Sequence, residues 1–146
     1  MSAALAAVRT RPAGLFEGYA SLFDAPDLAR DVIAPGAFAA SLRRRPARDV
    51  RLLWQHDPAE PVGRWMSLAE DGRGLRARGQ LNLEVARGRE LAALLAAGDV
   101  DGLSIGFRIV RARPDRLRSL RRIEAVDLWE VSLVTFPMLP GARVRR

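Results

Sequence analysis

The 146-residue sequence contains no cysteine, and its 24 basic residues are all arginine, so it has no lysine either. The absence of cysteine excludes disulfides, a thiolate nucleophile and cysteine-bound zinc. The absence of lysine excludes Schiff-base chemistry and a serine–lysine pair. A single histidine, His56, cannot supply the two imidazoles that the commonest zinc sites require. We therefore expect neither a metal nor another cofactor.

Aromatic residues and long apolar runs are also scarce. Aromatic side chains make up 6% of the chain, and no apolar run reaches the roughly 20 residues that span a bilayer. The formal net charge of +7 is typical either of a protein with an anionic partner or of a solvated surface rich in arginine. Nucleic acid is the less favoured partner, because the few aromatic residues do not cluster with arginine as a stacking surface requires. These features predict a soluble, intracellular protein that does not enter a membrane.

What is present is a 49% hydrophobic chain of the length of one domain. Residues 75–83 alternate between apolar and polar side chains, which predicts a half-buried strand. Residues 84–97 are rich in Ala and Leu and precede Gly98, which predicts a helix with a buried stripe of Val85, Leu91, Leu94 and Leu95. The full pattern predicts strands at 15–23, 49–55, 62–68, 75–83 and 102–110, helices at 35–42 and 84–97, and a loop at 111–119. Residues 121–127 and 128–135 are expected to form two last strands or one bent strand.

This pattern predicts a mainly β fold with helices (α+β), in which about seven strands form a small closed or nearly closed β-barrel with flanking helices. Residues 1–14 are expected to be a flexible tail, and 15–137 to form the functional domain. Order is expected to end at Pro137 and Pro140, which would leave 138–146 as a basic tail.

Two short segments carry the candidate chemistry. The segment WQHD ends a predicted strand at His56, where Asp57 and Pro58 are expected to stop strand pairing. The segment DGLSIGF places Ser104 between Gly102 and Gly106, which allow a close approach of the backbone. Taken alone, His56 is equally typical of a structural residue at a strand end, and Ser104 of a turn. As a pair they form a nucleophile with its base, and the residues that are missing exclude the other common pairs.

A base of this kind usually needs an acid to orient it. Glu124, Asp127 and Glu130 lie in the late strand region. Asp127 and Glu130 are three residues apart, so on one regular strand they would face opposite sides, and only one of them could reach His56. Asp57 is adjacent to His56 and is expected to serve the loop instead.

Ordered blocks of the sequence resemble the tailed-phage prohead (capsid maturation) serine proteases. The blocks are GYASLFDAPDLARDVIAPGAFAASL, WQHDPAEPVGRW, the stretch from GRGLRARGQLNL to DGLSIGF, and IEAVDLWEVSLVTFPMLPGARV. The resemblance runs from about Leu15 to Val144. It implies a serine endopeptidase, related in fold to the herpesvirus assembly protease, that acts inside the immature capsid (the prohead) in the cytoplasm of the bacterial host. The chain would belong to a phage, a prophage or a gene transfer agent.

The resemblance also implies residue roles and partners. The family histidine falls on His56 and the family serine on Ser104, and the third member falls on Glu130, with Asp127 as the alternative. Gly102, Gly106, Arg121 and Arg122 are weaker candidates for oxyanion support. The implied substrates are scaffold protein or the scaffold segment of the major capsid protein, with self-cleavage and a homodimer as further expectations. The competing hypothesis is an inactive relative, a capsid-assembly or scaffold-binding chaperone of the same fold.

Overall fold

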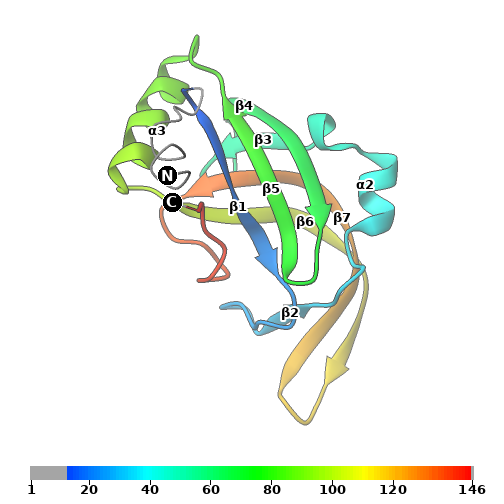
Figure 1. The fold of residues 1–146 in the computed structure, drawn as a ribbon. Coiled ribbons are helices and arrows are strands. Elements are labelled where there is room, and N and C mark those ends of the chain that lie inside the picture. Colours follow the sequence, from blue (N-terminus) through cyan, green and yellow to red (C-terminus); the bar gives the residue numbers. More distant parts are fainter. Residues whose placement is uncertain (1–12, 146) are drawn as a thin grey trace, which may run out of the picture.

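The computed structural model describes residues 13–145, which form one curled β-sheet with two α-helices at its sides (Figure 1). The sheet has seven strands in the order β1-β5-β4-β3-β7-β2, and β6 pairs with β7. The predicted mainly β class is confirmed, but the predicted closure is wrong: the sheet is a curled half-barrel that stays open. The elements are β1 (Leu15–Leu22), β2 (Asp31–Ile33), α2 (Ala39–Arg44), a 3₁₀ turn η1 (Ala47–Asp49), β3 (Arg51–Trp54), β4 (Asp57–Glu70), β5 (Gly74–Leu81), α3 (Ala86–Ala97), β6 (Gly102–Asp115) and β7 (Leu120–Val134).

The opening lies between β1 and β6, which are not paired directly. The C-terminal segment lies there instead, through isolated bridges from Val144 to Gly18 and from Arg143 to Gly102. Ala142 is fully buried, and its carbonyl accepts a hydrogen bond of 2.8 Å from the Leu103 amide. The expectation that order ends at Pro137 and Pro140 is therefore wrong for the described part of 138–146. The predicted N-terminal tail lies almost entirely in residues 1–12, outside the described part of the chain.

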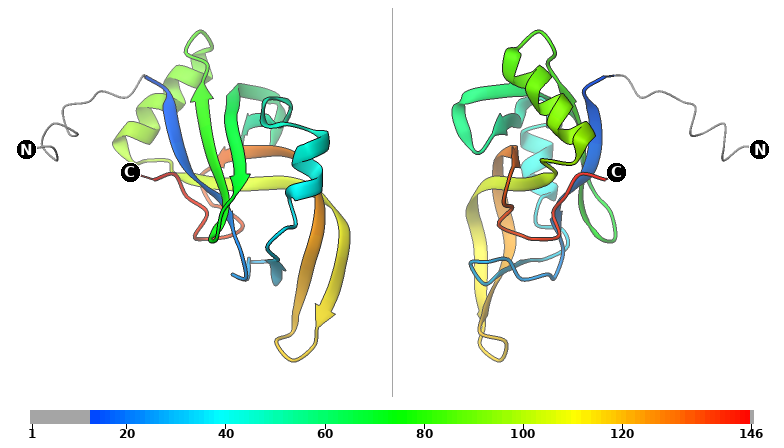
Figure 2. Two further views of the ribbon diagram at one scale, coloured as in Figure 1. Left: turned by 45° about the vertical axis from the view of Figure 1, so that its right-hand side comes forward. Right: turned by 90° about the vertical axis from the view of Figure 1, so that its left-hand side faces the viewer.

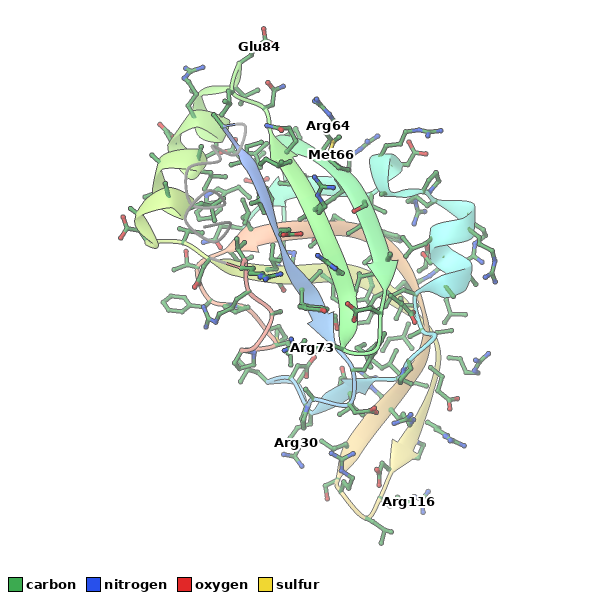
Figure 3. All side chains as sticks on the ribbon, viewed as in Figure 1. Arg30, Arg64, Met66, Arg73, Glu84 and Arg116 are labelled. Carbon is green, nitrogen blue, oxygen red and sulfur yellow. The ribbon has the colours of Figure 1, made fainter. Side chains whose placement is uncertain are left out.

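The predicted loop at 111–119 is correct only for the turn at 116–119, because β6 and β7 continue as a long hairpin that projects from the sheet in every view (Figures 1 and 2). Pro114 pairs with Arg121 in this arm. A proline is tolerated there because this part of β6 pairs with β7 alone, so a missing N–H need not break a second ladder. Arg116 lies at the tip of the arm (Figure 3). Of the two alternatives for residues 121–135, the structure has the single strand, β7.

The two helices lie close to their predicted places. Helix α3 ends at Gly98, which has a φ of 79°, as the Gly cap predicts. Leu91 in this helix is fully buried, whereas Val85 of the predicted stripe is exposed. Helix α2 starts at Ala39, later than the predicted Pro35, because the Glu70 carboxylate accepts the amides of Gly36 (2.7 Å) and Phe38 (2.9 Å) and holds that stretch as a turn.

The core lies inside the curl of the sheet. Strand β5 buries Leu75, Ala77, Gly79 and Leu81, as its alternation predicts. Trp65 of β4 contacts Phe16 edge-on at 5.5 Å between ring centroids, and its indole N–H donates to the Val131 carbonyl at 3.2 Å. This contact joins the two sides of the curl and anchors β7, the strand that carries the candidate site. None of the helices in residues 13–145 has the length and apolar character to span a bilayer.

Candidate active site

The pairing of β6 with β7 sets the floor of the candidate site. Ser104 lies directly opposite Ser132, and Gly106 lies directly opposite Glu130. Because side chains two residues apart in a strand share a face, these four positions lie on one face of the β6–β7 ribbon. Ser104 is buried, with 6% of its surface exposed. The register thus brings a serine and a carboxylate from distant parts of the chain onto one surface.

A two-residue turn places His56 beside this surface. Trp54 of β3 pairs with Asp57 of β4, so Gln55 and His56 form the whole connection. Both have positive φ, 55° and 61°, as the centre of a type I′ hairpin turn requires. Neither residue favours that conformation, which costs about 1–3 kcal/mol for each such residue. Other contacts of the fold must offset this cost. The two-residue turn thereby restricts the backbone of His56, the single histidine of the sequence.

The strand therefore does not stop at Asp57 and Pro58, as the sequence predicts, but reverses there into β4. Register shifts between Leu52 and Trp54 make this pairing irregular, which accommodates Pro58 without a regular ladder. Asp57 serves the turn, as expected, because its carboxylate accepts the Ala59 amide at 2.9 Å.

Hydrogen bonds to β7 hold the strained turn in place. The Gln55 amide donates to the Leu133 carbonyl at 2.9 Å, and the Gln55 side-chain oxygen accepts the Thr135 amide at 3.0 Å. The His56 amide donates to the Ser132 hydroxyl oxygen at 2.9 Å. The turn is thus fixed by hydrogen bonds to Ser132 and Leu133 of β7 and to Thr135 just after it.

Glu130 is the acid that contacts His56. Its Oε2 lies in hydrogen-bond contact with Nδ1 of His56, and its Oε1 accepts the Ser132 hydroxyl at 2.8 Å. The side chain of Glu130 is 14% exposed and that of His56 is 41% exposed. The carboxylate is therefore oriented from two sides, while the imidazole keeps one side toward solvent.

Ser132 is a member of this arrangement that sequence reasoning did not find. Its hydroxyl is fully buried and joins the His56 backbone to the Glu130 carboxylate. The available signal was its position two residues after Glu130, which places both side chains on one face of the same strand. A second signal, its pairing with Ser104, exists only in the tertiary structure.

Asp127 lies outside this arrangement. Its carboxylate accepts hydrogen bonds from Arg45 at 2.7 Å and from the Trp129 indole at 2.8 Å. The Trp129 and Arg45 bonds hold the pKa of Asp127 below its ordinary value, so it is ionised near neutrality. The expected alternation between the two acids does not apply, because a bulge inserts Trp129 and sets Asp127 opposite Arg108. Asp127 lies three residues before Glu130 in β7, and its bonds go to Arg45 and Trp129 instead of His56.

Ser104 and His56 line the same open hollow. Its other walls come from the loop before β2, the turn between β3 and β4, the end of β7 and the segment after β7. These residues are Leu28, Gln55, Val134, Phe136 and Met138. Within residues 13–145, the Ser104 hydroxyl makes no hydrogen bond. Such bonds often tighten only when a substrate is bound, so the shared hollow is the informative geometry.

The weaker candidates for oxyanion support have other contacts. A Cβ at Gly102 would come within 2.6 Å of the Val134 carbonyl, so this glycine allows close strand packing. Arg121 binds Asp31 through two bonds, of 2.8 and 3.0 Å, and Arg122 binds Asp24 at 2.9 Å. Neither arginine lines the hollow shared by Ser104 and His56. Their oxyanion role stays a prediction without a contact to support it.

Gly106 has a specific steric role toward Glu130. A Cβ at this position would overlap the Glu130 carboxylate. We expect Gly106→Ala to push Glu130 away from His56 and to lower kcat/KM for the peptide cleavage that the sequence resemblance implies by about 10²-fold, the scale set by a misplacement of about 1 Å. The matched control is Gly72→Ala, because a Cβ at Gly72 meets nothing within 4 Å. Wild-type kcat/KM in folded Gly106→Ala would contradict this role.

Comparisons with known proteins identify the family of the chain. The family described as caudovirus prohead serine protease matches residues 4–146. The prohead protease of Enterobacteria phage HK97 is 41% identical over 128 residues, which cover 85% of this chain and 56% of that protein. The chain thus spans little more than half the length of this relative.

Two solved structures resemble the fold. The bacteriophage T4 capsid assembly protease aligns with a TM-score of 0.67 at 13% identity, over 82% of this chain and 80% of that one. The KSHV protease bound to a hexapeptide phosphonate inhibitor aligns with a TM-score of 0.56 at 16% identity, over 89% of this chain and 63% of that one. At these identities the two structures support the fold alone. The match of the family over residues 4–146 shows that the chain belongs to the caudovirus prohead serine protease family.

Proposed function

We propose that the chain is a serine endopeptidase with Ser104 as nucleophile, His56 as general base and Glu130 as the residue that orients the base. The observation that carries this proposal is the contact of Glu130 with Nδ1 of His56, in a hollow that His56 shares with Ser104. A carboxylate on Nδ1 sets the tautomer that leaves Nε2 able to accept a proton, and it stabilises the imidazolium that follows.

The proposed reaction is acyl transfer in two halves. His56 Nε2 takes the Ser104 proton as the Ser104 oxygen bonds to the peptide carbonyl carbon. The carbon–nitrogen bond then breaks, and His56 returns the proton to the leaving amine. Water attacks the acyl-enzyme through the same base and releases the acid product. Backbone amides are the expected oxyanion donors.

The proposed substrates are scaffold protein or the scaffold segment of the major capsid protein, cleaved inside the immature capsid in the host cytoplasm. Support comes from the family and from the HK97 relative, which is a prohead protease. Self-cleavage and a homodimer are part of the same proposal. Since the chain spans 56% of that relative, these assignments are made for this chain by similarity.

The test joins a chemical and a biological readout. Wild-type protein and His56→Ala are treated with a fluorophosphonate, which acylates an activated serine, and the adduct is located by peptide mass mapping. We expect an adduct on Ser104 in the wild type and at most a trace in His56→Ala. Each protein is also co-expressed with the capsid and scaffold proteins encoded beside it, and we expect a shortened product from the wild type alone. The absence of both the adduct and the shortened product would favour the competing hypothesis, an inactive chaperone.

A further inference from the structure

Exposed apolar side chains gather at the candidate active site. Of the large apolar residues that remain exposed in residues 13–145, three line the hollow with His56 and Ser104: Leu28 is 72% exposed, Phe136 is 90% exposed and Met138 is 50% exposed. A cluster of exposed apolar surface of this kind usually marks a binding site. The other exposed members are spread over the rest of the chain: Met66, Val85, Val110, Leu117 and Trp129.

The rim that carries these side chains is held by hydrogen bonds. The Leu28 amide donates to the Met138 carbonyl at 3.0 Å, which joins the loop before β2 to the segment after β7. Gln55 holds Thr135, the neighbour of Phe136, through its amide group. The apolar rim is therefore largely formed before anything binds, which reduces the entropic cost of binding.

A second hollow shares part of its lining with the first. Ser104 and Met138 line both hollows. Most of the remaining wall of the second one is apolar, and it comes from β1, β2, β6 and the C-terminal segment: Ala20, Ile33, Leu103, Ile105, Phe107 and Leu139. Ser104 thus contributes to the lining of two largely apolar hollows.

Two carboxylates line the second hollow, and both are engaged by other groups. Asp31 binds Arg121 through both of its oxygens, at 2.8 and 3.0 Å. Asp27 accepts the backbone amides of Ala29 and Asp31 through Oδ1, at 2.8 and 3.0 Å. Their negative charge opposes an acidic side chain in the hollow, and the Arg121 pairing removes most of the attraction that Asp31 would offer to a basic one.

We infer that the site binds an extended peptide segment with uncharged, apolar side chains on both sides of the bond next to Ser104. One side chain fills the hollow lined by Ile33, Ile105 and Phe107, and another covers Phe136 and Leu28. The inference rests on the proposed function, because the candidate catalytic groups in the hollow identify the occupant as a peptide. Segments with acidic residues at these positions are excluded.

The test measures binding and cleavage separately. Ser104→Ala, which cannot form the acyl-enzyme, is titrated with three octapeptide libraries that share a random background and carry a fixed Leu, Lys or Glu at one central position. Binding is read by fluorescence anisotropy, and cleavage of the same libraries by the wild type is read by mass spectrometry. We expect the Leu library to bind at least 10-fold more tightly than the Glu library, and cleavage to follow the same order.

Substitution of the rim tests the location. Phe136→Ser, made in the Ser104→Ala background, is expected to weaken binding of the Leu library by about 10-fold, the scale of a lost apolar contact. Leu117→Ser is the matched control, since Leu117 is fully exposed at the tip of the β6–β7 arm and its loss should leave binding unchanged. Both variants change only exposed side chains, so circular dichroism should show unchanged folding.

Each outcome separates this inference from the proposed function. Tightest binding by the Lys library, equal binding by all three libraries, no binding up to millimolar peptide or an unaffected Phe136→Ser variant would each overturn the inference. A Leu preference that depends on Phe136, without any cleavage by the wild type, would keep the binding site and overturn the peptidase. Cleavage that depends on Ser104 but shows no apolar preference would keep the peptidase and overturn the apolar binding site.

Discussion

Ser104→Ala is expected to lower kcat for peptide cleavage by about 10⁶-fold, the scale measured when the nucleophile of a serine–histidine site is removed. The physical reason is that no other side chain in the hollow can form the acyl-enzyme: the chain has no cysteine or lysine, and Ser132 is buried and bonded to both His56 and Glu130. The measurement is turnover of a cleavable peptide, or of the capsid substrate, by purified protein.

The variant should leave stability almost unchanged. The Ser104 hydroxyl makes no hydrogen bond within the described residues, so its removal leaves no buried partner unsatisfied. We expect a Tm close to that of the wild type, which separates loss of chemistry from loss of folding. Ser67→Ala, on the exposed surface of β4, is the control and should keep full activity. Activity within 10-fold of wild type in Ser104→Ala would rule out this nucleophile.

Glu130→Gln is expected to lower kcat by about 10⁴-fold, the effect of replacing the orienting carboxylate by its amide in a serine–histidine–acid site. Glutamine has nearly the same shape, but it cannot stabilise an imidazolium, and its NH₂ group can turn His56 to the wrong tautomer. The measurement is kcat and KM for the same peptide. KM should change little, because Glu130 lies behind His56, away from the peptide.

Asp127→Asn is the matched control for Glu130→Gln. Both variants replace a carboxylate of β7 by its amide, three positions apart, and Asp127 contacts Arg45 and Trp129 instead of His56. We expect Asp127→Asn to keep kcat near wild type and to lower Tm, because the Arg45 pairing is weakened. Equal losses of kcat in the two variants would show that Glu130 acts through stability and has no special relation to His56.

Local patterns of the sequence predicted several elements correctly. The alternation along β5 and the Gly98 cap of α3 were confirmed, because each depends on residues that are neighbours in the chain. The long β6–β7 arm was missed, since Pro114 is a reliable strand breaker only inside a sheet, and this part of β6 pairs with β7 alone. The packed C-terminal segment was missed because its partners, Gly18 and Gly102, lie far away in the sequence.

For the candidate site too, some features follow from the sequence and others only from the tertiary structure. Composition alone restricted the base to His56 and excluded cysteine and lysine as nucleophiles, because residue types that are absent cannot take part in any fold. The choice of Ser104 among the serines came from its flanking glycines and from the family resemblance. The contact of Glu130 with His56 and its support by Ser132 depend on register: the pairing of Ser104 with Ser132 and of Gly106 with Glu130, and the turn at Gln55 and His56. Register depends on contacts between distant segments, and a one-residue slip would turn every side chain to the other face. The sequence by itself determined which groups were available for chemistry, and only the tertiary structure decided which carboxylate meets His56.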